Sequence, residues 1–142
     1  MTGTGQGIGR GCAIEMANAG YKVSLISPSD RSVELAAELG GIGRQGSVLD
    51  VDDLQGMVDE TMATYGRIDA IVSNMGHGGS GPEAINTVGF DADFDGPLLE
   101  LSDALWHESL DMYVLNVVKI ARIVTPILII QGGGALVNIS SM

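Results

Sequence analysis

The sequence is short of several residue types, and each shortage excludes a class of protein. Only seven lysines and arginines stand against 18 acidic residues, which gives a formal net charge of -11 at pH 7. Binding to a nucleic-acid backbone relies on clustered basic side chains, so these scattered cations argue against a nucleic-acid partner. The single cysteine, Cys12, excludes an internal disulfide.

Long hydrophobic runs are also missing. The most apolar stretch, residues 123–130 (IVTPILII), is broken by Thr125 and Pro126 and is far shorter than the roughly 20 residues that cross a bilayer. No charged and then apolar segment of the kind that directs secretion opens the chain. We therefore expect a protein without a membrane span, located in the cytoplasm.

What is present is a repeating alternation of two kinds of segment. Residues 52–65 carry apolar side chains at helical spacing, whereas residues 21–27 are apolar and rich in β-branched residues, as in a buried strand. Further short strands are expected at residues 44–51, 67–74 and 135–140. Strands that alternate with helices favour a parallel sheet. We expect one domain over residues 1–142, an α/β Rossmann-like, doubly wound parallel sheet in three αβα layers.

Two later segments depart from this rhythm. Residues 77–96 are rich in Gly and Asp and show no period, so we expect a functional loop or a flexible insertion there. Its alternating Asp91, Asp93 and Asp95 lack the glutamate that a calcium loop requires, so no metal site is expected. A long helix follows, which Pro126 should kink or nearly end.

The chain opens with a glycine-rich run, MTGTGQGIGR. It contains no G-x-G-x-x-G, but it fits T-G-x-x-x-G-x-G through Thr2, Gly3, Gly7 and Gly9. A backbone that must turn sharply, approach a pyrophosphate and then pack a helix closely on a sheet needs glycine at such positions. A flexible glycine-rich terminus is the alternative interpretation of this run.

Three more motifs fall where strands of the expected sheet should end. They are Asp50–Val51, SNMG at 73–76, and GGGALVNISS at 132–141. Ligands of open α/β sheets bind at the carboxyl edge of the strands. Together with the glycine turn, and in the same order and spacing, these motifs resemble the short-chain dehydrogenase/reductase family over nearly the whole chain.

The resemblance implies an NAD(P)-dependent oxidoreductase that moves hydride between nicotinamide and a carbonyl or alcohol carbon of a small-molecule substrate. It also implies three groups of cofactor contacts: the pyrophosphate, the adenine, and the adenine ribose with the nicotinamide side. The residues implied, in that order, are Gly3, Gly7, Ile8 and Gly9, then Asp50 and Val51, then Asn74 and Gly76. Ser141 matches the family's catalytic serine, which would bond the substrate oxygen where charge develops.

The choice between the two cofactors stays open. An acidic residue at the end of the second strand bonds the ribose of NAD, but Ser27 and Pro28 stand there. Without that acid, Arg31 could meet the extra phosphate of NADP, which favours NADP. Asp30 favours NAD.

The chain departs from the family in three places. No tyrosine is followed by a lysine at the family's spacing, no strand precedes the glycine turn, and the family's helix asparagine falls on Tyr113, with Asn116 three residues later. We therefore expect a partial domain truncated at both ends and inactive by itself. Whether Asn116 substitutes for the asparagine is open.

Two other functions remain as alternatives. One is a catalytically inactive nucleotide-binding fragment, which the missing tyrosine and lysine favour. The other is an S-adenosylmethionine-dependent methyltransferase, which also uses a glycine-rich turn but needs an acid where Ser27 and Pro28 stand. The resemblance to the dehydrogenase family also implies that the apolar long helix could pair two copies of the chain into a homo-oligomer.

Overall fold

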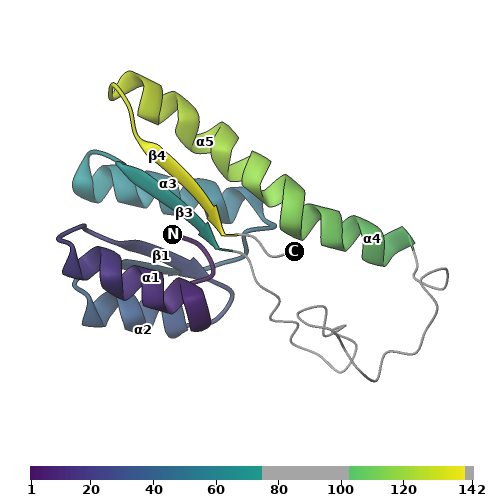
Figure 1. Ribbon diagram of the computed structural model, residues 1–142, viewed down its shortest axis with the longest axis horizontal. Coiled ribbons are helices and arrows are strands. Elements are labelled where there is room, and N and C mark those ends of the chain that lie inside the picture. Colours follow the sequence, from purple (N-terminus) through teal and green to yellow (C-terminus); the bar gives the residue numbers. More distant parts are fainter. Residues whose placement is uncertain (75–102, 140–142) are drawn as a thin grey trace.

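A computed structural model describes residues 1–74 and 103–139 (Figure 1). Helices and strands alternate along these residues, as the sequence predicts. The elements in chain order are α1 (Gly7–Asn18), β1 (Ser24–Ser27), α2 (Arg31–Glu38), β2 (Ile42–Gln45), α3 (Val51–Tyr65), β3 (Ala70–Asn74), α4 (Asp103–Leu110), the π-helical turn η2 (Asp111–Leu115), α5 (Asn116–Ile130) and β4 (Ala135–Ile139).

The strands pair in two parallel couples that the first residues of the chain join. β1 pairs with β2 and β3 pairs with β4, both in parallel. Between the couples, Thr2 forms a parallel bridge with Ile26 of β1, and its backbone N–H donates to the Val72 carbonyl of β3 (3.0 Å). Residues 1–3 therefore take the place of a short central strand, in the order β2, β1, residues 1–3, β3, β4.

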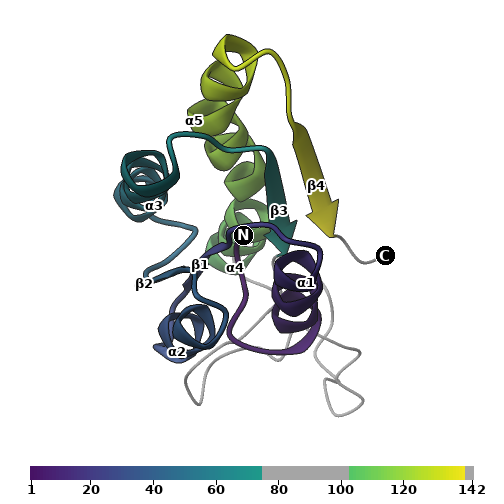
Figure 2. The ribbon, with the colours of Figure 1, turned by 90° about the vertical axis from the view of Figure 1, so that its left-hand side faces the viewer.

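Helices cover both faces of these strands (Figure 2). Each face has its own apolar cluster. On one face α1 and α2 pack on β1 through Ala13, Leu25 and Leu35, which are at most 3% exposed. On the other face α3 and α5 pack on β3 through a second cluster that includes Leu54 and Val124. The α/β class with parallel strands and helices in outer layers is confirmed.

The strand predicted at residues 44–51 is wrong in its position. β2 occupies Ile42–Gln45 and ends well before Asp50. Asp53 explains the early end, since its carboxylate accepts a hydrogen bond from the Ser47 N–H (2.8 Å) and lies 3.7 Å from the Arg44 guanidinium. These contacts pull the chain into a turn from which α3 starts.

The predicted long helix is present, but Pro126 does not end it. α4, η2 and α5 follow one another without a break, and α5 continues four residues past Pro126 to Ile130. The buried side chains of Val124 and Leu128 hold both sides of the proline in the apolar cluster, which offsets the one hydrogen bond that proline removes. The expected loop at residues 77–96 lies outside the described residues.

Residues 111–130 form 20 helical residues with mean hydropathy 1.8, long and apolar enough by length and composition alone to span a membrane. Two observations favour a helix that packs within this protein. Lys119 and Arg122 stand in its middle, where charges are costly in lipid, and the Lys119 ammonium donates to the Leu49 carbonyl (3.1 Å). Ile120 is also buried in the apolar cluster against the sheet.

Candidate functional site

The glycine run forms a turn at the carboxyl ends of β1 and β3. The backbone N–H of Gly3 donates to the Ile26 carbonyl (3.0 Å), after which the chain leaves the sheet and enters α1 at Gly7. Gly3 and Gly7 have φ angles of 63° and 56°, a left-handed conformation that residues with a Cβ rarely adopt. The turn is thus part of the folded edge, which is evidence against a flexible terminus.

Two of the glycines are also required by close packing. A Cβ on Gly9 would come within 2.6 Å of the Asn74 amide nitrogen and even closer to the Gly3 carbonyl oxygen. A Cβ on Gly3 would overlap the Asn74 carbonyl oxygen. α1 therefore packs against the turn at a distance that only glycine allows.

Asn74 and Thr2 fasten the turn to the end of β3. The Asn74 side-chain amide donates to the Gly3 carbonyl (3.1 Å), and the Asn74 backbone N–H donates to the Thr2 hydroxyl (3.1 Å). The Asn74 amide expected near the cofactor thus already supports the glycine turn. The part played by Thr2, which is 4% exposed, was not expected, although its place in the motif was recognised.

The start of α1 is open. Gln6, the N-cap residue, makes no side-chain hydrogen bond to the first turn. A Cβ on Gly7 would meet no atom within 4 Å, and Ile8 is 65% exposed. Free N–H groups and the positive end of the helix dipole at such a start attract an anion.

Thr4 was missed in the sequence, although it stands inside the glycine run. It is fully buried, and its hydroxyl has no hydrogen-bond partner among the described residues. Glycines with no room for a Cβ, an uncapped helix start and an unsatisfied hydroxyl together fit the pyrophosphate of a dinucleotide.

Polar side chains after β1 lie against the same turn. The Ser27 hydroxyl donates to the Ser29 carbonyl (3.0 Å), and a Cβ on Gly5 would come within 3.2 Å of the hydroxyl oxygens of both serines. The Arg31 guanidinium donates to the Gln6 side-chain carbonyl (2.8 Å). Ser27, Ser29 and Arg31 therefore gather beside the glycine run, and the contacts of Ser27 and Arg31 with a cofactor stay predictions.

Asp50 and Val51 begin α3 instead of ending a strand. The Asp50 carboxylate accepts a hydrogen bond from the Asp52 N–H (2.8 Å) and so caps the helix, while Val51 is 48% exposed. Their contact with adenine stays a prediction. Gly76 and Ser141 lie outside the described residues, so their roles stay predictions as well.

Asn116 sits where π-helical turn η2 meets α5. It is 2% exposed, and its side-chain amide donates to the Met112 carbonyl inside that turn. Its side-chain carbonyl accepts from the Ser73 hydroxyl of β3 (3.4 Å). Tyr113, at the position expected from the family's spacing, is 44% exposed.

Titratable groups give one further feature of this region. Burial lowers the pKa of the Met1 α-ammonium to about 6, even though the residue as a whole is only partly buried.

Within residues 1–74 and 103–139, no three His, Cys, Asp or Glu side chains are grouped so that they could hold a metal ion.

Comparison with known proteins gives one consistent family. The family model described as short chain dehydrogenase matches residues 1–142. A 3-oxoacyl-[acyl-carrier-protein] reductase, FabG, of Staphylococcus aureus is 26% identical over all of this chain and 54% of its own length. A 7alpha-hydroxysteroid dehydrogenase of Escherichia coli is 26% identical over all of this chain and 52% of its own length.

Solved structures agree with these sequence matches. The crystal structure of a 3-ketoacyl-ACP reductase from Sinorhizobium meliloti superposes with a TM-score of 0.81 at 26% identity, over 99% of this chain and 52% of that one. The chain thus spans about half the length of the relatives it matches. These dehydrogenases and reductases give the methyltransferase alternative no support.

Proposed function

Because the chain belongs to the short-chain dehydrogenase family, we propose that it carries the dinucleotide-binding half of an NAD(P)-dependent oxidoreductase. The observation that carries the proposal is the glycine turn at the carboxyl edge between β1 and β3. There a backbone that excludes a Cβ at Gly3 and Gly9 leads directly into the uncapped start of α1. Such an edge offers N–H donors to a pyrophosphate without a side chain in the way.

The reaction proposed for the whole enzyme is hydride transfer on a carbonyl or alcohol carbon of a small molecule. When bound, a nicotinamide cofactor supplies or accepts the hydride. Gly3, Gly7, Ile8 and Gly9 would hold the pyrophosphate. Asn74 keeps the turn in place through its bond to Gly3, and Ser141 would donate a hydrogen bond to the substrate oxygen.

We further propose NADP as the preferred cofactor. Arg31 is held beside the glycine run by Gln6, and the serine hydroxyls of Ser27 and Ser29 face the same region. A guanidinium and hydroxyls suit a phosphate ester on the adenine ribose, and no carboxylate stands at position 27 or 28 to repel it.

Binding measurements with the chain itself test both proposals. Fluorescence or calorimetric titration is expected to show binding of NADPH, with weaker binding of NADH. Arg31→Ala should weaken NADPH binding by about tenfold or more, because it removes a charge-assisted bond, and should leave NADH binding nearly unchanged.

The matched control is Arg10→Ala. Arg10 is an exposed arginine of α1, and its guanidinium pairs with Glu38 at 3.8 Å. Arg10→Ala should leave the affinities for NADPH and NADH unchanged. No binding of either dinucleotide to the folded chain would refute the proposed function, whereas equal losses of NADPH and NADH on Arg31→Ala would refute only the preference for NADP.

We also propose that the enzyme is a cytoplasmic homo-oligomer whose copies meet through the long helix. Trp106, Leu110, Val114 and Val118 follow one another at intervals of four along α4, η2 and α5, and each is between 36% and 51% exposed. Apolar side chains gathered on one face of a helix favour contact with another protein surface.

A further inference from the structure

The chain passes from β2 to α3 through a tight turn that runs from Ser47 to Asp50, called the Ser47 turn below. The Asp50 N–H donates to the Ser47 carbonyl across this turn (3.2 Å). The Ser47 hydroxyl accepts from the Leu49 N–H (3.2 Å), and Val48 is 6% exposed and belongs to the apolar cluster of α3 and α5. The Ser47 turn is therefore held by bonds and packing.

One carbonyl of the Ser47 turn is bonded from the long helix. α3 uses the carbonyl of Asp50, which accepts from the Leu54 N–H (3.2 Å). The Leu49 carbonyl stands one residue earlier, and it accepts from the Lys119 ammonium of α5 (3.1 Å). α3 and α5 lie on the same face of the sheet (Figure 1), so Lys119 joins the long helix to the start of its neighbour.

Lys119 is held in this place from a second side. Its ammonium lies 3.6 Å from an Asp111 carboxylate oxygen of η2, and its side chain is only 23% exposed. Its neighbours on α5 are anchored too, because Asn116 is 2% exposed and Ile120 is 5% exposed. An ammonium that has lost most of its contact with water depends on partners in the protein, so the bond to Leu49 is a fixed one.

The peptide group between Leu49 and Asp50 is thus bonded at both ends. Its carbonyl accepts from Lys119, and its N–H donates to Ser47. Because a peptide group is planar, these two bonds together fix how the whole group is turned. Asp50 continues from this plane with φ −92° and ψ 120°. The direction of its side chain therefore depends on the bond that Lys119 makes.

Only one oxygen of the Asp50 carboxylate is bonded within the part of the chain that the structure describes. This oxygen is Oδ1, which caps α3 through the Asp52 N–H. Asp50 is exposed, so its other oxygen is open to a ligand. An ionised carboxylate accepts hydrogen bonds and donates none. It suits the amino group of adenine, whereas hypoxanthine carries a carbonyl at the same ring position.

We propose that Lys119 is a positioning residue for adenine recognition. Through the Leu49 carbonyl it sets the direction in which Asp50 presents its open carboxylate oxygen to the adenine amino group. The inference rests on the proposed function and on the predicted contact between Asp50 and adenine. Lys119 acts through the peptide group before Asp50 and not by contact with the cofactor.

Discrimination between adenine and hypoxanthine measures this role. Titrations compare NADPH with its analogue in which hypoxanthine replaces adenine. We expect the parent chain to bind NADPH about tenfold more tightly, because the analogue turns a carbonyl toward the Asp50 carboxylate. Lys119→Met should remove most of this preference. Lys119→Arg should keep it, since a guanidinium also donates to a carbonyl.

Arg122→Met is the matched control. Arg122 is exposed and lies one turn after Lys119 on α5, so this variant removes the same charge without touching the Ser47 turn, and the preference should stay. A double-mutant cycle with Asp50→Ala shows whether Lys119 acts through Asp50. In the Asp50→Ala chain the preference should already be absent, and Lys119→Met should change it no further.

Amide hydrogen exchange gives a readout without cofactor. In Lys119→Met the Asp50 amide should exchange about threefold faster or more, while Ser73, paired with β4, stays protected as the reference for a folded sheet. Unchanged exchange at Asp50 would overturn the inference.

The titrations separate the inference from the proposed function. Absence of dinucleotide binding by the folded parent chain would refute the proposed function, and the adenine role with it. If the parent chain binds dinucleotides, equal affinity for NADPH and its analogue would overturn the inference alone. So would a preference that survives Lys119→Met, or one that Arg122→Met removes to the same extent.

Discussion

At the scale of single residues, the glycines of the first turn are needed for different reasons. Gly7 is required by its positive φ, with open space around it, whereas Gly9 is required because its neighbours leave no room for a Cβ. Gly11 has neither constraint, since a Cβ there would meet no atom within 4 Å. The sequence pattern alone does not distinguish these three positions.

Gly9→Ala is expected to disrupt the turn. The added methyl must push Gly3 or Asn74 aside, which should destabilise the fold by about 1–3 kcal/mol and weaken dinucleotide binding. Gly11→Ala, in the same helix, should instead raise the unfolding free energy by roughly 0.5–1 kcal/mol and leave binding intact. Thermal unfolding and NADPH titration measure both effects, and equal behaviour of the two variants would contradict the packing argument.

The buried α-amine of Met1 should make stability depend on pH. Its pKa falls from 8.0 to about 6 in the folded chain, so the unfolded chain binds a proton that the folded chain does not. Stability is then fully present above pH 8 and decreases as the pH falls to 6, by about 3 kcal/mol for a two-unit shift. Denaturant unfolding at several pH values measures the slope.

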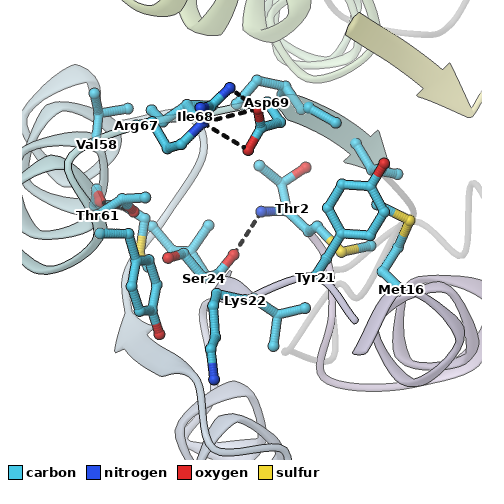
Figure 3. A pocket seen from close by; sticks show the side chains of 18 of the residues that line it. Thr2, Met16, Tyr21, Lys22, Ser24, Val58, Thr61, Arg67, Ile68 and Asp69 are labelled. Atoms are coloured by element: carbon cyan, nitrogen blue, oxygen red, sulfur yellow. Dashed lines mark hydrogen bonds and ion pairs between the residues drawn. The ribbon is translucent and has the colours of Figure 1, made fainter. Parts of the chain in front are cut away.

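The chain acetylated at Met1 is the control for this slope. Lys22, Arg67 and Asp69 line one cavity together with Met1 (Figure 3), with Arg67 Nε 3.0 Å from an Asp69 carboxylate oxygen, but these groups are common to both forms. A slope between pH 8 and 6 that survives acetylation would assign the effect to another group.

At the scale of elements, α3 starts where it does because of Asp50. Its carboxylate caps the helix through the Asp52 N–H, and Gly66 ends the helix with a φ of 73°. The sequence indicated the helix, but it placed Asp50 at the end of a strand. An aspartate before an apolar run is compatible with the end of a strand and with the cap of a helix. Only the contact between Asp53 and Ser47 decides between these two structures.

Asp50→Ala should therefore lower stability by about 1 kcal/mol through loss of the cap. Asp50→Asn is the matched variant, because asparagine caps a helix about as well as aspartate, and we expect its stability to stay close to that of the parent chain. Thermal unfolding of the three proteins checks this. If Asp50→Asn were as unstable as Asp50→Ala, the carboxylate charge and not the cap would be responsible.

The π-helical turn before α5 depends on Asn116. This side chain bonds to the Met112 carbonyl within the turn and to Ser73 of β3, so it joins the long helix to the sheet. Asn116→Ala should cost roughly 1–3 kcal/mol, because a buried carbonyl loses its partner. Ser73→Ala should cost less, since its contact is long at 3.4 Å; a double-mutant cycle measured by chemical unfolding separates the two.

At the scale of the whole molecule, much apolar surface is left open. Besides the row along the long helix, Ile129 and Ile130 are 72% and 87% exposed, and Val137 of β4 is 49% exposed. The relatives are about twice as long as this chain. Such surfaces are normally covered by protein, either by further chain or by a second copy.

The oligomer proposal makes one prediction at this scale. Val114→Glu should shift the protein toward smaller species in light scattering after gel filtration, because it places a charge in the apolar row. Val33→Glu is the control, since Val33 is 41% exposed but lies on α2, and it should leave the size unchanged. A size that neither variant changes would locate the contact elsewhere.

The sequence by itself determined the class of fold, the order of its elements and the family. Local signals were sufficient for these, because apolar spacing marks each helix and strand, and the glycine turn and the strand-end motifs occur in a fixed order.

Only the tertiary structure decided the contacts between residues far apart in the chain. It set Asn74 against Gly3, joined Asn116 to Ser73, moved the end of β2 away from Asp50 and placed Met1 beside Ser24. Each of these depends on how segments 20 to 70 residues apart pack, or on a side-chain bond that competes with strand pairing. Such distances are fixed by close packing of the folded chain, and spacing along the sequence does not encode them.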